Sequence, residues 1–239
     1  SNRISQFMER LRDASEELGR IRRVLRAQFP HLADIEIPAQ VTNNVTLSTM
    51  HGCPPDEVER IASYLLRERH LHTTVKLNPT LLGAEQVRRI LREDLGYNEI
   101  HIPDSVFAKD MQYSRAVQLI HQLTSVAAEE GLTFAVKLSN TLAMANHKSN
   151  LPGQEMYMSG RALYPITMNL FHRLGRDVPD LRVSFSAGAD AFNIVDILAA
   201  GARPVTMATD LLKPGGYARL RQCTDQLQEH MRSRKLRSL

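Results

Sequence analysis

The sequence predicts an α/β protein of the TIM-barrel type, in which parallel strands alternate with helices. Six apolar strand-like segments are each followed by a helix-like segment, an order typical of parallel strands joined by crossover helices. No glycine-rich dinucleotide fingerprint opens the first strand–helix unit, which disfavours a Rossmann domain. A complete barrel has eight strands, so we expect a partial barrel that lacks its first strands.

The elements are predicted from apolar periodicity and from Pro and Gly at helix boundaries. Residues 3–28 form one long helix, which Pro30 ends. Strands are expected at 41–49, 73–78, 98–102, 132–138, 181–186 and 204–209, and helices at 55–69, 84–95, 113–130, 160–174, 190–200 and 217–236. We therefore divide the chain into an N-terminal helix, residues 1–30, and a barrel fragment, residues 31–239.

Composition excludes several classes of protein. The 239 residues are 43% hydrophobic and 23% charged, which is typical of globular proteins. No apolar run is long enough to cross a membrane. Two cysteines, Cys53 and Cys223, cannot build a disulfide framework, which favours the cytoplasm. The net charge of +4 comes from the two ends of the chain, so the slightly acidic middle argues against binding of nucleic acid.

Small and polar residues follow the strands, where a barrel carries its chemistry. A glycine turn at Gly188 and a threonine at Thr209 follow the last two strands, and together they could cradle a phosphate. Lys76 and Lys137 lie on apolar strands in the matched contexts VKLNPT and VKLSNT. Three interpretations stay open for these lysines: a cation beside an anionic cofactor, a Schiff-base amine, or a side chain that reaches solvent.

Acid–base groups follow the first strand. His51 and Cys53 flank Gly52 and could transfer protons, although a lone cysteine is more often a small buried residue. His70 and His72 form an HxH pair, but they precede their strand and have no Cys or carboxylate spaced beside them. The sequence therefore predicts no metal site.

Five segments together carry a family resemblance: LSTMHGCPP, TVKLNPTLLG, VKLSNTL, LPGQEMYMSGRALYP and PVTMATDLLKPGGY. Over roughly residues 40–220 the chain resembles the YgfK family, large cytoplasmic iron–sulfur flavoproteins labelled as selenate reductase subunits. The resemblance implies an excised piece of an NAD(P)H-linked oxidoreductase. It also implies that 4Fe–4S clusters and FAD or NAD(P) belong to other domains of the parent protein, which would be the partners of this chain.

More distantly, the chain resembles the flavin barrels of dihydroorotate and dihydropyrimidine dehydrogenases. That likeness implies FMN across the C-terminal strand ends. Lys76 matches the lysine that approaches the flavin ring, and Thr49 stands where those enzymes keep a catalytic Cys or Ser. The remaining matches are the pair Asn140 and Thr141, the helix start Ser159 and Gly160, and the phosphate contacts Gly188 and Thr209.

Three functions follow from these observations. The first is a flavin-dependent oxidoreductase domain that uses Lys76 and one of Thr49, His51 or Cys53. The second is a cofactor-free degenerate barrel that serves as an assembly module. It is motivated by Thr49, by Ala187 in place of a phosphate-loop glycine, and by Asp210, whose charge opposes phosphate unless Lys213 or Arg161 compensates.

The third function is a Schiff-base lyase that uses Lys76 or Lys137. Because a partial barrel exposes two sheet edges, we expect the isolated chain to dimerise or to cover an edge with helix 3–28. We also expect the chain alone to be inactive.

Overall fold

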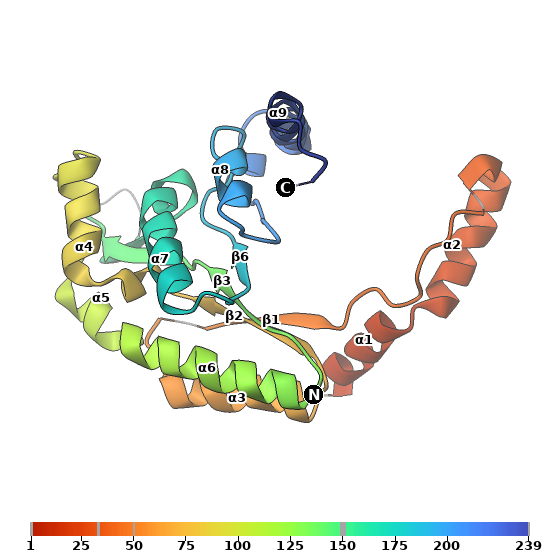
Figure 1. Cartoon of the computed structure of the whole chain (residues 1–239), viewed down its shortest axis with the longest axis horizontal. Helices are drawn as coiled ribbons and strands as arrows, with labels where there is room; N and C mark the ends of the chain where they lie inside the picture. Colours follow the sequence, from red (N-terminus) through yellow and green to blue (C-terminus); the bar gives the residue numbers. More distant parts are fainter. Residues whose placement is uncertain (1, 33, 50, 149–151, 239) are drawn as a thin grey trace. The chain divides into compact units, whose positions relative to one another are not determined.

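A computed structural model describes residues 2–32, 34–49, 51–148 and 152–238 (Figure 1). The chain forms two compact units, residues 1–45 and 46–239, whereas the sequence placed its boundary after residue 30. Met50 and Leu151, which fall in two of the family motifs, lie outside the described residues.

The first unit contains two helices in place of the single helix expected over residues 3–28. Helix α1 spans Asn2–Arg12 and α2 spans Ser15–Gln28, followed by the short 3₁₀ turn η1, Pro30–Leu32. At the break, the backbone N–H and hydroxyl of Ser15 both donate to Asp13 Oδ1, at 3.0 and 2.6 Å. This local side-chain bond competes with the helical backbone bonds, so the prediction of one continuous helix is wrong.

The second unit contains a four-stranded sheet in the order β1-β2-β3-β6, of which the first two residues of β1 belong to the first unit. The strands are β1, Asn44–Ser48; β2, His72–Leu77; β3, Phe134–Leu138; and β6, Val183–Phe185. β2 pairs with β3 and β3 with β6 in parallel, which confirms the α/β class. Val205 adds one parallel bridge to Phe185, so the predicted strand 204–209 is reduced to a single pairing.

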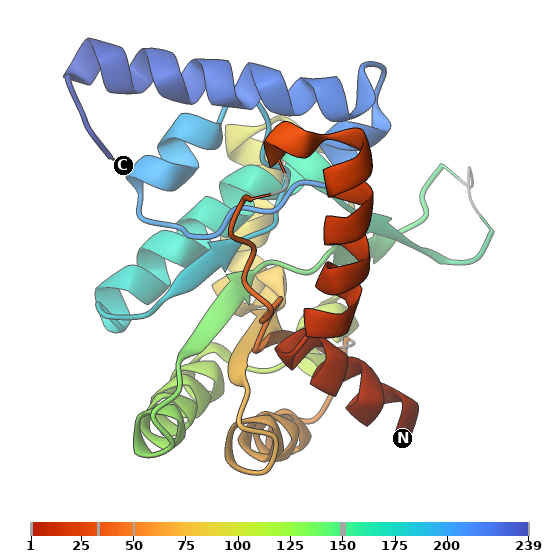
Figure 2. The same cartoon turned by 90° about the vertical axis from the view of Figure 1, so that its right-hand side faces the viewer.

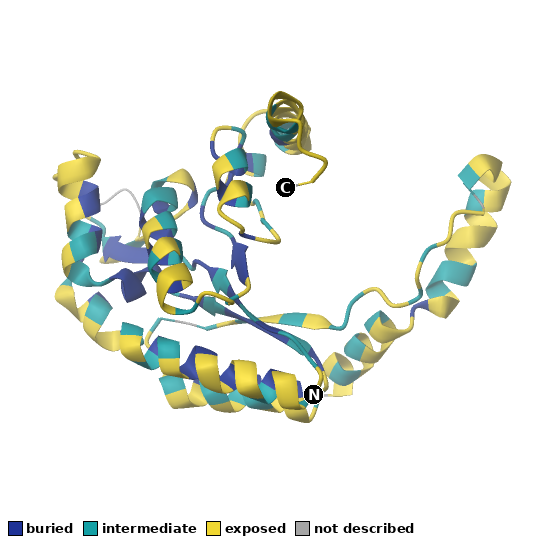
Figure 3. Ribbon diagram, viewed as in Figure 1, coloured by how far each residue is buried: buried dark blue, intermediate teal, exposed yellow. Residues whose placement is uncertain are grey.

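Helices cover one face of this sheet. α3, Pro55–Arg67, and α6, Tyr113–Glu129, lie side by side along it, with their buried residues turned inward (Figures 1 and 3). The other helices are α4, Ala84–Arg89; the π-helical η3, Ile90–Asp94; α5, Asp104–Lys109; α7, Tyr164–Asp177; α8, Ile194–Ala199; and α9, Arg219–Arg234. The 3₁₀ turns η2, Pro79–Leu82; η4, Gly160–Leu163; η5, Thr209–Leu212; and η6, Gly216–Ala218, connect them. Figure 2 shows the strands and helices of this unit from the side.

The two faces of the sheet differ in chemistry, because successive side chains of a strand point to opposite sides. The face toward the helices carries Val75, Leu77, Val136, Leu138 and Phe185, all buried in the hydrophobic core. The opposite, inner face carries Thr74, Lys76, Ala135, Lys137 and Ser184. Barrel interiors are usually filled by bulky branched residues, so this inner face is unusually polar.

Two further expectations are wrong. Residues 98–102 form no strand; there the backbone N–H of Ala145 donates to the His101 carbonyl, and Arg88 donates to that of Ile102. Residues 142–160, for most of which the sequence predicted neither strand nor helix, contain an antiparallel hairpin of β4, Leu142–Ala145, and β5, Glu155–Met158. No helix in the described part of the chain is long and apolar enough to span a bilayer.

The packing of the core predicts that replacing two leucines by alanine changes the free energy of unfolding by very different amounts. Leu119 on α6 is fully buried, whereas Leu212 is 86% exposed. We expect Leu119→Ala to lower the free energy of unfolding by about 2–5 kcal/mol, since it leaves a cavity. Leu212→Ala should change it by less than about 0.5 kcal/mol. Urea unfolding followed by circular dichroism measures both, and equal losses would contradict this packing.

Candidate functional site

A cavity of about 260 Å³ lies at the carboxyl ends of the strands in the second unit. Six of the seven cofactor-binding candidates line it: Lys76, Thr141, Ser159, Gly160, Gly188 and Thr209. Ser139, Ser186, Ala189, Met207 and Asp210 are among the other lining residues. Residues far apart in the sequence thus meet at the end of the sheet where the barrel hypothesis placed them.

Two glycine turns interlock at this cavity. A Cβ atom on Gly188 would lie 2.1 Å from the carbonyl carbon of Gly160, and one on Gly160 would lie 2.8 Å from Thr209 Cγ2. Both glycines have positive φ, +74° and +67°, which side chains other than hydrogen disfavour. The turn after β6 therefore rests directly on the turn that begins η4 and α7.

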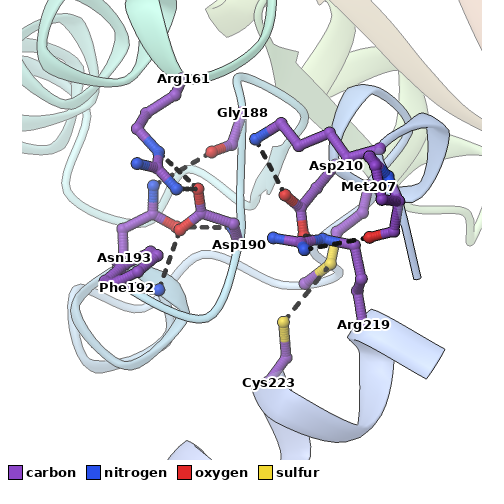
Figure 4. Close-up of polar contacts among 11 residues, drawn as sticks. Arg161, Gly188, Asp190, Phe192, Asn193, Met207, Asp210, Arg219 and Cys223 are labelled. Carbon is purple, nitrogen blue, oxygen red and sulfur yellow. Dashed lines mark hydrogen bonds and ion pairs between the residues drawn. The ribbon is translucent and has the colours of Figure 1, made fainter. Parts of the chain in front are cut away.

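Side chains hold the Gly188 turn from behind (Figure 4). Asn193 Nδ2 donates to the Gly188 carbonyl at 3.0 Å, and Asn193 Oδ1 accepts the Asp190 N–H at 2.8 Å. Across the described residues, the backbone N–H groups of Gly188 and Ala189 donate to no protein acceptor. Successive free N–H groups in such a turn form an anion-binding concavity.

Each of the two buried carboxylates beside these turns is neutralised. Asp190, 1% exposed, accepts from Arg161 Nε at 2.6 Å. Asp210, 4% exposed, accepts from Arg219 Nε at 2.9 Å and from Lys213 Nζ at 3.1 Å. These partners, Arg219 first, lower the pKa of Asp210 against the effect of burial. The compensation expected from Lys213 is present, while Arg161 is bound to Asp190 instead.

The two strand lysines lie side by side. Lys76 of β2 is in register with Lys137 of β3, and both are half-buried. Burial lowers the pKa of each lysine, and the charge of Lys137 lowers that of Lys76 further.

His51 is held by a carboxylate that the sequence did not single out. His51 Nδ1 lies 3.0 Å from Asp110 Oδ2, and Asp110 also accepts from Thr80 Oγ1 at 2.7 Å and from the Gly52 N–H at 2.9 Å. The bond to Asp110 raises the pKa of His51, although burial opposes it. Burial opposes the shift of Asp110 as well, but its three donors hold that pKa below the usual value.

The second ring nitrogen of His51, Nε2, is enclosed by the protein. His51 Nε2 is buried and has no hydrogen-bond partner among the described groups. The ring stacks on Tyr157 of the β4–β5 hairpin, with centroids 6.0 Å apart. The backbone of Thr141, a cavity residue, also contributes to the raised pKa of His51.

The other two proton-transfer candidates are less suited. Thr49 Oγ1 makes a long hydrogen bond of 3.4 Å to the Lys76 carbonyl. Burial and the nearby Glu57 raise the pKa of the Cys53 thiol, which disfavours the reactive thiolate.

Asn140 is the one cofactor-binding candidate outside the cavity lining. It ties strand ends together, since its Nδ2 donates to Asn78 Oδ1 at 2.7 Å and to the Thr49 carbonyl at 3.3 Å. Ser48 Oγ reaches its Oδ1 at 3.4 Å. Asn140 therefore shapes the end of the sheet and places Thr141 on the cavity wall.

No three His, Cys, Asp or Glu side chains are grouped to hold a metal ion in the ranges that the structure describes. His72 Nδ1 accepts the Thr133 N–H at 2.9 Å, which gives one member of the HxH pair a structural partner.

Comparison with known proteins gives a match over nearly the whole chain. The profile of the family described as "Oxidoreductase YgfK, N-terminal TIM-barrel domain" matches residues 1–238. "Putative oxidoreductase YgfK" of Escherichia coli (strain K12) is 49% identical over 193 residues, which are 80% of this chain and 19% of that protein. The protein of the same name from Escherichia coli O157:H7 gives the same values. The chain thus spans about a fifth of the length of these curated relatives.

Two solved structures are similar in fold to part of this chain, at low sequence identity. A ligand-free DHODH from Eimeria tenella aligns with 75% of this chain and 58% of its own, at 14% identity and a TM-score of 0.43. The DHODH from the same organism in complex with ferulenol aligns with 76% of this chain and 54% of its own, at 16% identity and a TM-score of 0.39.

The interlocked turns predict different costs for two glycine substitutions. Gly188 and Gly201 both have positive φ, but a Cβ on Gly201 meets no atom within 4 Å. Gly201→Ala should therefore cost only the backbone strain, about 1–2 kcal/mol. Gly188→Ala should cost at least ~2 kcal/mol more, because the two turns must separate. Chemical unfolding compares the two variants; equal losses would mean that the turns do not touch.

The Asp110 contact predicts a change in the titration of His51. Because the carboxylate favours the charged imidazolium, Asp110→Asn should lower the pKa of His51. Heteronuclear NMR of the histidine side chains measures this, with exposed His121 on α6 as the resonance that should not move. An unchanged His51 titration would show that the pair does not form in solution.

Proposed function

This chain belongs to the family of the N-terminal TIM-barrel domain of the oxidoreductase YgfK, and on that premise we propose that it is a flavin-binding oxidoreductase domain. The flavin is FMN, held across the C-terminal ends of the strands. The observation that carries the proposal is the cavity of about 260 Å³ in which six of the predicted cofactor-binding residues meet. The chain is one part of a longer NAD(P)H-linked protein, and its partners are the other domains of that protein.

The residues around the cavity fit a phosphate. The N–H groups of Gly188 and Ala189 donate to no acceptor among the described residues, the Gly160 turn lies against Gly188, and Thr209 lies against Gly160. A helix of fourteen residues, α7, follows the Gly160 turn, and its N-terminal end favours an anion. Asp210, the main objection to a phosphate here, is neutralised by Lys213 and Arg219.

The remaining groups suit flavin chemistry. A bound flavin supplies electron and hydride transfer. Lys76 would bind the ring and balance negative charge on it. His51 would hold or accept a proton at Nε2, while Asp110 at Nδ1 fixes the orientation of the imidazole. Among Thr49, His51 and Cys53, the environment of His51 is the one that supports proton transfer.

Two alternatives remain as outcomes of the same experiment. The lowered pKa of Lys76 and Lys137 would also suit a Schiff-base lyase, because a neutral amine is the nucleophile. A cofactor-free assembly module would keep the fold and bind no flavin. For the longer protein we propose three further properties. These are iron–sulfur and FAD or NAD(P) domains, a cytoplasmic location, and the selenate reduction that the family label names.

The test is the flavin content of the intact longer protein. We expect a flavin absorption spectrum, with FMN released by acid. Thr209→Glu should reduce the FMN content at least tenfold, because a carboxylate at the phosphate position repels it. Thr224→Glu on the exposed side of α9 adds the same charge and should leave the content unchanged.

Absence of flavin from the wild-type longer protein would favour the assembly module. Full FMN content in Thr209→Glu would refute the assignment of the phosphate site. Borohydride reduction in the presence of a carbonyl compound identifies the lyase alternative, because it would trap an adduct on Lys76 or Lys137.

A further inference from the structure

Three large hydrophobic side chains of the second unit project into solvent near the cavity. Phe192 is 81% exposed, Leu212 86% and Tyr217 81%, and no other large hydrophobic side chain of the described residues is as exposed. Single exposed hydrophobic residues are normal on a protein surface, whereas several that gather in one region usually mark an interaction site. Aromatic side chains are also enriched at protein interfaces.

These side chains come from turns that meet at the carboxyl ends of the strands. Phe192 lies in the turn after β6, and the guanidinium carbon of Arg161, in η4, lies 4.7 Å from the centre of its ring (Figure 4). Leu212 ends η5, whose first residue packs against the first residue of η4. Tyr217 lies in η6, which packs against η5 and leads directly into α9. We call Phe192, Leu212 and Tyr217 the apolar rim.

The exposed charges beside the apolar rim are positive. Both carboxylates in these turns, Asp190 and Asp210, are buried, so a partner could not touch them directly. The exposed charged side chains of η4, of the turns around η5 and η6, and of the first turn of α9 are those of Arg161, Lys213 and Arg221. The surface that complements this region is therefore apolar in its centre and bordered by carboxylates.

The relatives of this chain contain a candidate partner for such a surface. The family is that of an N-terminal domain, and the matched part is 19% of each curated relative, so about four-fifths of those proteins lies outside it. Interfaces between domains of one protein resemble transient interfaces between proteins, which are more polar than permanent ones. A few apolar side chains with a charged border are typical of such a contact.

We propose that the apolar rim is the docking surface for another domain of the longer protein, and that this domain presents an apolar surface bordered by carboxylates. The inference rests on the proposed function only in treating this chain as part of that longer protein, and it does not require flavin. Docking there brings the partner beside the cavity, because Thr209 and Asp210, the first residues of η5, line it.

The test compares the intact longer protein with the 239-residue chain by hydroxyl-radical footprinting, in which mass spectrometry measures how fast each side chain is oxidised. Exposed Phe, Leu and Tyr side chains all react readily with the radical. In the longer protein, the apolar rim should be oxidised at least about fivefold more slowly than in the chain alone, because a docked domain excludes water from it. Equal rates in the two samples would overturn the proposal.

Matched variants of the longer protein locate the contact. Leu212→Asp places a charge in the apolar contact, so oxidation of Phe192 and Tyr217 should return to within about twofold of the rates in the chain alone. Tyr64→Asp makes the same kind of change at a 51% exposed position on α3 and should leave the rim protected. Both positions are exposed, so both variants should fold, which circular dichroism checks. Protection that survives Leu212→Asp would rule out docking at the rim.

A third variant tests the charge of the partner. Arg221 lies about one helical turn after Tyr217 and is exposed. In the longer protein, Arg221→Glu should speed the oxidation of Tyr217 at least about twofold, because carboxylates on the partner would repel it. An unchanged rate would refute the acidic border assigned to the partner.

Other occupants of the apolar rim would give different footprints. If the rim of the 239-residue chain is oxidised as slowly as buried Phe185, this chain or a second copy covers it, and the proposal is wrong. Protection of the chain by phosphatidylglycerol vesicles, with none in the longer protein, would assign the rim to a membrane surface instead. Because the footprint does not depend on flavin, the docking surface can fail while the flavin proposal survives, and the reverse also holds.

Discussion

The candidate site depends on one contact, the approach of the Gly188 turn to the backbone of Gly160. No side chain fits between the two turns, since a Cβ on Gly188 would lie 2.1 Å from the Gly160 carbonyl carbon. This contact brings the turn after β6 to the start of η4, where Thr209 lies against Gly160. Both turns line the cavity, and α7 begins directly after η4.

The charged side chains around the cavity fall into two groups, paired carboxylates in the loops and lysines on the strands. The two carboxylates closest to the glycine turns are buried and fully paired, so they support the loop without repelling an anion. Neither strand lysine forms an ion pair within the part of the chain that the structure describes, and burial lowers the pKa of both. Three cations, Arg161, Lys213 and Arg219, neutralise the buried carboxylates of the loops. Two others, Lys76 and Lys137, lie on the inner face of the sheet.

The sequence predicted the parallel α/β organisation and six of the fourteen cavity-lining residues, from local patterns and from the resemblance to flavin barrels. Apolar runs identified β2 and β3, and small residues after strands identified Gly188 and Thr209, whereas Gly160 came from the resemblance to flavin barrels. It failed where distant residues decide the structure. Asp110 stands 59 positions from His51, so no spacing rule could connect them. The β4–β5 hairpin was missed because its strands are only four residues long, although Pro152 and Gly153 mark a turn between them. The broken helix depends on the bonds between Asp13 and Ser15.

The pairing of Arg219 with Asp210 sets a limit on where this domain can be divided. Arg219 is the first residue of α9, and Asp210 is 4% exposed in the cavity wall. A shortened chain that stops before α9 would keep every strand of the sheet, but it would leave a buried carboxylate with Lys213 alone. The last helix is therefore an integral part of the barrel unit, and a domain boundary drawn from the strands would fall too early.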